Sequence, residues 1–284
     1  MRTVHSIAEL RVQIAAWRRA GERIALVPTM GNLHAGHLRL VRHAQQLAPR
    51  VVASVFVNPL QFGPNEDFER YPRTLARDAE VLEAAGCDLL FAPSAAEMYP
   101  RGREGLTMLK APAEAEVLCG QYRPGHFDGV LTVVNLLFNQ AQPDVAVFGQ
   151  KDYQQLFLIR RMAADLHQPL DVVGVHTERE VDGLAMSSRN QYLSADERRL
   201  APAVYRALSA IGEALRDGRR DYAALCAEQA KALESMGFRP QYLEVRRPDL
   251  GVPGRDEDAF VVFLAAYLGQ TRLIDNVQIN VAAV

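Results

Sequence analysis

The sequence predicts an α/β protein in which a doubly wound parallel sheet is followed by a smaller C-terminal α+β domain. Short apolar runs with the length of buried strands alternate with helical patterns up to about residue 177. This alternation is typical of a parallel sheet with helices on both faces. After that point two long helical patterns come first and strand-like runs follow, which is an α+β order. We therefore expect domains at 1–177 and 178–284.

The N-terminal part is predicted to form five buried strands separated by helices. Ser6 begins the first predicted helix, which extends to Ala20 and is closed by Gly21. Thr74 is the predicted cap of a helix that ends at Gly86. The predicted strands are 24–28, 51–57, 88–91, 144–148 and 170–175, and further helices are predicted from residue 38 onward and at 128–139 and 152–166. A domain with this alternation is Rossmann-like.

The C-terminal part has a different order of elements. Ser194-Ala-Asp-Glu197 has the spacing of a capping box and opens a predicted helix that extends to Arg216. A second helix is predicted from Tyr222 to Met236, just before Gly237. Three strand-like runs follow at 241–245, 259–264 and 271–279.

The bulk composition is that of a soluble enzyme. The 284 residues, 49% hydrophobic and 23% charged, suffice for one large core or two modest ones. A net charge of −2 without like-charge runs indicates no broad nucleic-acid surface. Cys87, Cys119 and Cys226 lack CxxC spacing, which fits a reducing compartment. Because neither a signal-peptide pattern nor an apolar run of about 20 residues is present, we expect a cytoplasmic protein with no membrane or nucleic-acid partner.

Two imidazoles, His34 and His37, lie between the first predicted strand and the helix that follows it. Ligands of open α/β sheets bind at the carboxyl ends of strands, and a helix N-terminus there favours phosphate. The pair could instead be ordinary loop residues that help to cap the helix. A zinc pair is disfavoured, since no HExxH pattern and no nearby cluster of cysteines or carboxylates completes such a site. The favoured interpretation is a His-x-Gly-His element that binds nucleotide phosphates and stabilises charge in the transition state.

Two later segments carry weaker phosphate signals. Gly149, Lys151 and Asp152 follow a strand and precede a helix, so they offer a close backbone approach, a positive charge and a helix cap or ribose contact. Taken alone, this segment would be an ordinary turn with an exposed lysine. The segment 182–190 places two hydroxyls before a guanidinium on a predicted loop, which suits a mobile clamp on pyrophosphate. The alternative interpretation of this segment is a Ser-rich linker without a binding role.

Neutral amides lie beside the same strand ends. Asn58 and Gln61 follow the second strand of the predicted sheet, and Gln154 and Gln155 lie in the first turn of a later helix. Amides between aromatic residues could bind a small polyhydroxylated acid without a cationic pocket. The turn 123–127 could be either a lid or a packing turn, and composition does not decide between them.

The sequence resembles the pantothenate synthetase (pantoate–β-alanine ligase) family of the HxGH nucleotidylyltransferase superfamily. The matching segments are PTMGNLHAGH (28–37), FVNPLQF (56–62), RYPRT (70–74), RPGHFDGV (123–130), FGQKDYQQL (148–156) and DGLAMSSRNQYLS (182–194). The resemblance implies a two-step ligation through pantoyl adenylate, with ATP as a substrate and Mg²⁺ on its triphosphate. It also implies a homodimer of two-domain subunits whose second domain acts as a cover.

The resemblance also assigns roles to residues. His34, His37, Lys151, Ser187, Ser188 and Arg189 would be catalytic, with His37 as the proton donor. ATP would be bound by Met30, Gly31, Asn32, Leu33, His34, Ala35, Gly36, His37, Gly149, Gln150, Lys151, Asp152, Glu178, Met186, Ser187, Ser188 and Arg189. Pantoate would be held by Gln61 and Gln155, with Gln61 also near β-alanine, and Asn58 is a further predicted substrate-binding residue. No metal ligands are assigned.

The chain departs from the family pattern at four positions. Ala35 and Gln150 stand where acidic residues are frequent, and both changes remove negative charge near a triphosphate. His176 stands where proline is expected, and Glu178 where an apolar residue beside the adenine is expected. Two alternatives remain: a nucleotidyltransferase of the same superfamily that stops after its first step, and a nucleotide-binding module without catalysis.

Overall fold

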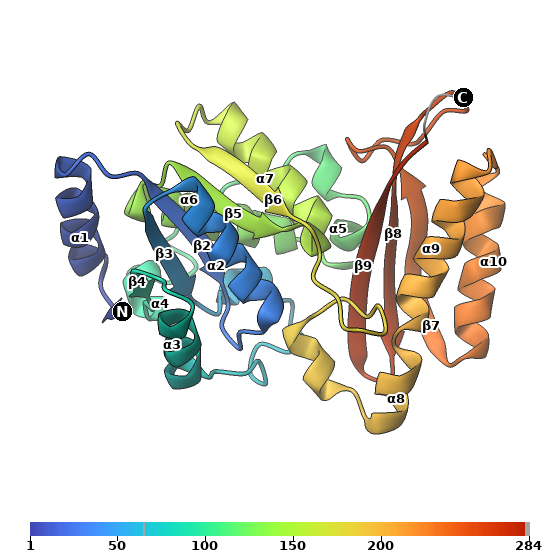
Figure 1. The fold of residues 1–284 in the computed structure, drawn as a ribbon, viewed down its shortest axis with the longest axis horizontal. Coiled ribbons are helices and arrows are strands. Elements are labelled where there is room, and N and C mark those ends of the chain that lie inside the picture. Colours follow the sequence, from blue (N-terminus) through green and yellow to red (C-terminus); the bar gives the residue numbers. More distant parts are fainter. Residues whose placement is uncertain (65, 282–284) are drawn as a thin grey trace. The chain divides into compact units, whose positions relative to one another are not determined.

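The computed structural model describes residues 1–64 and 66–281 (Figure 1). The chain divides into two compact units. Unit 1 comprises Met1–Gln150 and Gln155–His176, and unit 2 comprises Lys151–Gln154 and Thr177–Val284. The expected folding domains, 1–177 and 178–284, stay a prediction, because compactness does not show that either part folds by itself.

In the described part of unit 1, six strands form one sheet in the order β1-β4-β3-β2-β5-β6. Each neighbouring pair is parallel. The strands are β1 (Arg2–Val4), β2 (Ile24–Thr29), β3 (Arg50–Val55), β4 (Leu89–Phe91), β5 (Val145–Gly149) and β6 (Asp171–Val175). The direction of winding reverses at β2, since β3 lies on one side of it and β5 on the other. In doubly wound sheets the carboxyl ends at such a reversal are where ligands bind.

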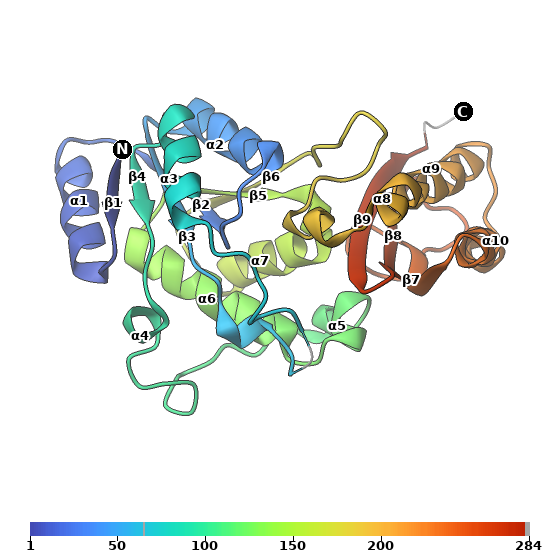
Figure 2. The same ribbon diagram turned by 90° about the horizontal axis from the view of Figure 1, so that it is seen from below.

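Helices cover both faces of this sheet, as Figure 2 shows with α2 and α3 on one side and α6 on the other. The helices are α1 (Ile7–Arg19), α2 (Ala35–Leu47), α3 (Leu75–Ala84), α4 (Ala95–Met98), α5 (Cys119–Tyr122), α6 (His126–Ala141) and α7 (Tyr153–Asp165). Val27 of β2, Val41 of α2 and Leu82 of α3 are fully buried in a shared core. The predicted doubly wound parallel sheet is confirmed.

Unit 2 has a three-stranded antiparallel sheet with β8 in the middle among its described residues. Its strands are β7 (Phe238–Arg246), β8 (Ala259–Leu268) and β9 (Thr271–Asn280), and its helices are α8 (Ala195–Leu200), α9 (Ala203–Arg216) and α10 (Tyr222–Ser235). Helices α9 and α10 pack against the sheet and against each other. Leu208 and Ile211 of α9 share a core with Val262 and Leu264 of β8. The α+β prediction is confirmed.

Two sequence predictions about elements were wrong. The single helix expected from 194 to 216 is two helices, because Pro202 lies between α8 and α9 and has no N–H to donate to the preceding turn. The capping box at its start is present, with Ser194 Oγ accepting the N–H of Glu197. The edge strand β1 was missed, since three residues are too few to show an alternating pattern.

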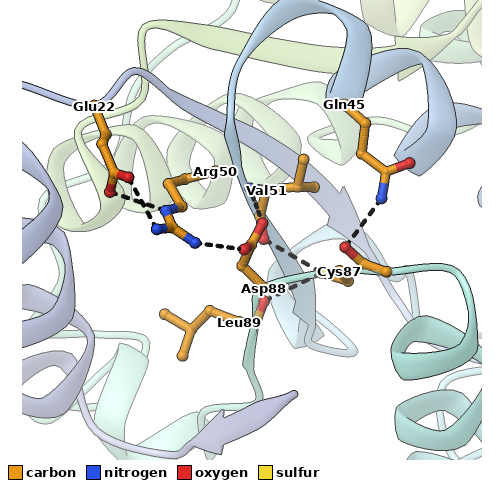
Figure 3. A network of polar contacts seen from close by, with 8 residues as sticks. Glu22, Gln45, Arg50, Val51, Cys87, Asp88 and Leu89 are labelled. Atoms are coloured by element: carbon orange, nitrogen blue, oxygen red, sulfur yellow. Dashed lines mark hydrogen bonds and ion pairs between the residues drawn. The ribbon is translucent and has the colours of Figure 1, made fainter.

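Ion pairs connect the amino ends of neighbouring strands in unit 1 (Figure 3). Arg50, the first residue of β3, binds Glu22 through Nε at 2.9 Å and Asp88 through Nη1 at 3.0 Å. The Asp88 carboxylate also accepts the N–H of Val51 at 2.8 Å. Cys87 lies buried beside this network, and burial raises the pKa of its thiol to about 11. Charged side chains therefore stabilise this end of the sheet.

Asp144 connects the amino ends of β2 and β5 in a similar way. Its carboxylate accepts the N–H of Ile24 at 2.7 Å and an Nη1–H of Arg18 at 2.9 Å. Burial opposes ionisation, but these two hydrogen bonds outweigh it and hold the pKa of Asp144 below its ordinary value. The contact joins the first residue of β2 to the residue that precedes β5.

We expect Asp144→Asn to lower the free energy of unfolding by about 1 kcal/mol near neutral pH, because a charge-assisted contact is lost. The folded pKa is lowered, so the carboxylate stabilises the protein above its unfolded pKa of roughly 3.9. That contribution disappears as the pH falls through the lowered folded value. Denaturant titrations should therefore show the gap between wild type and variant closing in acid. A gap that stays constant would contradict this role.

Candidate active site

The segment after β2 turns sharply before α2 begins. Gly31 and Asn32 have positive φ values of 82° and 51°, a region that glycine enters freely and asparagine tolerates. Thr29 Oγ1 donates to Ser54 O at 2.8 Å and accepts the N–H of Gly31 at 3.2 Å. Thr29 thus ties the start of the turn to β3.

Asp78 of α3, only 1% exposed, holds the same turn from the side. Its Oδ2 accepts the N–H of Asn32 at 3.0 Å, and its Oδ1 accepts the N–H of Leu33 at 2.9 Å. Thr74 Oγ1 donates to Oδ2 at 3.1 Å. A Cβ on Gly31 would lie 2.9 Å from the same oxygen, so glycine leaves the room that this contact needs. The conformation of the turn is therefore set by a carboxylate that sequence reasoning missed.

His34 and His37 lie together at the N-terminus of α2. The N–H of His34, the N-cap residue, donates to Nδ1 of His37 at 3.3 Å, and the ring centroids are 4.1 Å apart. Because Nδ1 accepts, the neutral ring of His37 carries its proton on Nε2, which makes Nε2–H a donor. The first turn, 35–38, contains no acidic residue, so no carboxylate on it offsets the positive end of the helix dipole.

Met30, Asn58 and Gln61 form a second polar cluster in unit 1. Gln61 donates from Nε2 to Met30 Sδ at 3.2 Å, and Asn58 donates from Nδ2 to Gln61 Oε1 at 3.0 Å. Asn58 is only 1% exposed, and its Oδ1 accepts the hydroxyl of Tyr99 at 2.7 Å. The sequence suggested that both amides reach a ligand. In the structure the buried Asn58 amide contacts Gln61, and its contact with a ligand stays a prediction.

The turn that contains Arg123 and His126 packs beneath Gln61. His126 Nδ1 and Arg123 Nη2 both bind the carbonyl of Gln61, at 2.8 and 3.2 Å. Arg123 also bonds Glu66 through Nε at 2.6 Å and contacts His126 Nε2 through Nη1 at 2.9 Å. This arrangement makes the segment a packing turn, the second of the two interpretations that composition left open.

Gly129 of α6 lets the short 3-10 turn η1 (Pro59–Gln61) lie directly against the helix. A Cβ at this position would lie 2.3 Å from Leu60 O and 2.8 Å from Gln61 N. We expect Gly129→Ala to push this turn away and to lower the free energy of unfolding by about 1–3 kcal/mol, the cost of overpacking. Denaturant unfolding measures the effect, with Gly254→Ala as the control because its nearest atom is 4.0 Å away. Equal stability of the Gly129 variant and wild type would contradict the close packing.

Strand β5 ends at Gly149 and leads into the short turn η3 (Gln150–Asp152). A Cβ built on Gly149 meets no described atom within 4 Å, so the backbone is open to close approach. The Lys151 side chain is 18% exposed, and its Nζ lies 3.8 Å from the Asp152 carboxylate. Gln155 lies half-buried in the first turn of α7. Lys151 and Asp152 belong to unit 2, whereas Gly149 and Gln155 belong to unit 1.

The residues Ser187–Arg189 follow a hydrogen-bonded hairpin, Glu178–Met186. Arg179 and Ala185 form a β-bridge, and the N–H of Met186 donates to the carbonyl of Glu178 at 2.9 Å. Ser187 caps the 3-10 turn η4 (Ser188–Tyr192), and its Oγ accepts the N–H of Arg189 at 3.3 Å. The segment is therefore ordered by its own hydrogen bonds, and its role as a phosphate clamp stays a prediction.

Each unit gathers part of the predicted site. Unit 1 brings together the histidine turn and the Gln61 cluster, and carries Gly149, Gln150 and Gln155. Unit 2 carries Lys151, Asp152, Glu178 and the segment 186–189. Nothing in the described residues groups three or more His, Cys, Asp or Glu side chains as a metal site would require. Imidazoles, a helix N-terminus, a lysine and an arginine are suited to binding a polyanion.

Comparisons with known proteins identify the family of the chain. The family model described as pantoate-beta-alanine ligase matches residues 2–278. The chain belongs to the pantoate–β-alanine ligase family. A relative in this family, the pantothenate synthetase of Azotobacter vinelandii, is 56% identical over 283 residues, covering 99% of this chain and 100% of its own length.

Solved structures of the pantoate–β-alanine ligase family share the fold. Pantothenate synthetase from Thermus thermophilus has a TM-score of 0.91 at 49% identity, covering 98% of this chain and 99% of its own. The ligase of Francisella tularensis, solved in complex with β-γ ATP and β-alanine, has a TM-score of 0.81 at 33% identity and covers 98% of this chain and 97% of its own.

None of the helices in residues 1–64 and 66–281 combines the length and hydropathy needed to cross a bilayer.

Proposed function

We propose that this chain joins pantoate to β-alanine in a reaction driven by ATP. The observation that carries the proposal is the His34–His37 pair at the start of α2, placed at the reversal point of a parallel sheet in a chain of the pantoate–β-alanine ligase family. The Francisella relative was solved in complex with β-γ ATP and β-alanine, which supports the same ligand classes here.

The proposed reaction has two steps. The pantoate carboxylate attacks the α-phosphorus of ATP, the bond to the β-phosphate breaks, and pantoyl adenylate and pyrophosphate form. The amine of β-alanine then attacks the acyl carbon, AMP leaves with the electron pair of the acyl–oxygen bond, and the amine loses a proton to give pantothenate. Neither step needs a covalent enzyme intermediate, so catalysis rests on positioning and on charge stabilisation.

The phosphate-binding residues follow from this chemistry. The Nε2–H of His37 donates to a phosphate oxygen as negative charge develops, with His34 beside it. Lys151, Ser187, Ser188 and Arg189 hold the leaving pyrophosphate. The remaining ATP contacts are Met30, Gly31, Asn32, Leu33, Ala35, Gly36, Gly149, Gln150, Asp152, Glu178 and Met186. The backbone carbonyl of Glu178 accepts the N–H of Met186 in the hairpin, and its second lone pair can accept a hydrogen bond from the nucleotide.

Gln61 and Gln155 hold pantoate in this proposal, and Asn58 positions Gln61. We expect Gln61→Ala to raise the apparent KM for pantoate about 3- to 10-fold, because one or two neutral hydrogen bonds are lost. The KM for ATP should change little. Initial-rate kinetics with each substrate varied in turn measure both constants. A change confined to the ATP constant would overturn the pantoate assignment.

Mg²⁺ enters the proposal as part of the ATP substrate. On the triphosphate it would be held mainly by phosphate oxygens and water. Bound there, it would neutralise the charge of the leaving group.

We also propose a homodimer in the cytoplasm. The absence of CxxC spacing among Cys87, Cys119 and Cys226 supports a reducing compartment.

A product assay tests the proposed function. Over multiple turnovers, purified protein should convert ATP to AMP and pyrophosphate only when both pantoate and β-alanine are present. Pantothenate should form in an amount equal to that of AMP. Pyrophosphate release that needs no β-alanine and yields a stable nucleotide product would identify the alternative nucleotidyltransferase. ATP binding without any turnover would identify the non-catalytic module.

A further inference from the structure

Two adjacent buried polar residues, Asp275 and Asn276, interrupt the apolar pattern of β9 in unit 2. They are 3% and 5% exposed. Side chains of successive strand residues point to opposite faces of a sheet. Asp275 pairs in register with Leu264, which belongs to the core formed with α9, and Asn276 pairs with Phe263. The pair therefore presents one polar group to each face of the sheet.

Asp275 anchors the hairpin that leads to Ser187. Arg179, near the start of the hairpin, donates to both Asp275 oxygens, at 2.6 and 3.0 Å. The same guanidinium donates to the carbonyl of Gly183 in the hairpin at 3.0 Å and lies 3.9 Å above the ring of Tyr205. Such a forked arrangement fixes direction as well as distance. The guanidinium thus holds the hairpin against β9.

Gly183 allows this close packing. Its φ is +92°, and a Cβ there would lie 2.6 Å from Cδ1 of Tyr205. The hairpin is closed by the N–H of Glu180, which donates to Leu184 O at 2.8 Å. Ser187 follows directly in the sequence, so the position of Ser187–Arg189 depends on this anchored hairpin.

Asn276 anchors the segment that carries Lys151. Its Nδ2 donates to the backbone carbonyl of Lys151 at 2.8 Å. Two residues later, Tyr153 packs its ring edge-on to Phe263 at 5.5 Å between centroids, and its hydroxyl donates to Pro248 O at 3.1 Å. These contacts explain why Lys151–Gln154 belongs to unit 2 although the residues on either side belong to unit 1.

The two anchors are bonded to each other. The N–H of Asn276 donates to Asp275 Oδ1 at 2.8 Å, and the carbonyl of Asn276 accepts an Nη2–H of Arg179 at 3.3 Å. A shift of Asp275 therefore displaces Asn276 and the Lys151 segment that Asn276 holds, and a shift of Asn276 displaces Arg179 and its hairpin. We propose that Asp275, Asn276 and Arg179 form a positioning element that couples Lys151 to Ser187–Arg189, so that the two segments bind the pyrophosphate together. The inference rests on the proposed function, and none of the three residues need touch a substrate.

The test compares Asn276→Ala with Asn280→Ala, an exposed asparagine on the same strand and face. In the positioning role, Asn276→Ala lowers kcat/KM for ATP at least about tenfold, since small misplacements of binding groups are costly. The KM for pantoate and the cooperativity of unfolding stay near those of wild type. Asn280→Ala behaves as wild type throughout. Equal ATP kinetics of the two variants would overturn the proposal.

Hydrogen exchange gives a readout that does not depend on activity. Coupling predicts that Asn276→Ala speeds amide exchange in 183–190 as well as in 151–154, and that Arg179→Lys, which keeps the charge but not the fork, does the same in both segments. If each variant loosens only the segment that it contacts, the two anchors are independent and the proposal is wrong. Failure of the wild type to use pantoate and ATP would refute the proposed function, and the exchange result would still decide whether the segments are coupled.

Discussion

Replacement of His37 by alanine is expected to lower the rate of adenylate formation roughly 10²- to 10³-fold, the usual cost of removing one donor that stabilises transition-state charge. The hydrogen bond from the His34 N–H to Nδ1 leaves the His37 proton on Nε2, so the lost group is a directed donor. ATP binding should change far less than the rate. Single-turnover formation of the adenylate, with ATP and pantoate saturating, measures this step.

Two further variants separate catalysis from helix capping. In His37→Asn, the side-chain oxygen can take the place of Nδ1 and accept the His34 N–H, but no donor replaces Nε2. In His37→Gln, an amide donor can approach the Nε2 position while the cap contact is lost. We expect the asparagine variant to be stable and nearly inactive, and the glutamine variant to keep part of the rate. An active asparagine variant would reduce His37 to a capping residue. His43→Ala, on the same helix, is the matched control.

Gly149→Ala is expected to impair ATP use without harming the fold. The added Cβ meets no described protein atom within 4 Å, so the free energy of unfolding should stay within about 0.5 kcal/mol of wild type. If the nucleotide approaches this backbone closely, the methyl group costs about 1–3 kcal/mol of binding, or roughly a 5- to 150-fold higher KM for ATP. Steady-state kinetics and denaturant unfolding of the same preparation measure both quantities.

Gly254→Ala serves as the control for the glycine variant, because its Cβ also has open space. It should leave both stability and the KM for ATP unchanged. A Gly149 variant with normal ATP kinetics would show that the nucleotide does not approach the end of β5, and the assignment of the segment 149–152 would have to be withdrawn.

The parts of the site that sequence predicted are those coded by neighbouring residues. The histidine turn, the segment after β5 and the Ser187–Arg189 segment each lie within a few residues of a strand end or a turn, so apolar runs and glycines locate them. The sheet order of unit 1 is partly local, since β2 and β3, β3 and β4, and β5 and β6 are consecutive strands that lie side by side, whereas the pairs β1·β4 and β2·β5 are not consecutive. The break at Pro202 was predictable and was overlooked, because proline inside a helical pattern ends the helix.

The supporting contacts could not be predicted because they join residues far apart in the sequence. Asp78 lies 46 residues from Asn32, and Arg179 lies 96 residues from Asp275. A faint signal existed for Asp78, since it stands four residues before the buried Leu82 on one face of α3. An acid on an apolar helix face suggests a buried partner, but only the fold identifies which backbone amides it binds. The same holds for the buried Asn58, whose contacts with Gln61 and Tyr99 only the fold identifies.

The account depends most on the first chemical step, in which a carboxylate attacks the α-phosphorus of ATP. Exchange of labelled pyrophosphate into ATP, measured with Mg²⁺ and without β-alanine, tests this step directly. We predict exchange that requires pantoate and is lost in His37→Asn, because the acyl adenylate forms reversibly at the histidine turn. Exchange that proceeds without pantoate, or with a different acid only, would contradict the proposed first substrate. The absence of exchange with any acid, in a protein that binds ATP, would contradict catalysis itself.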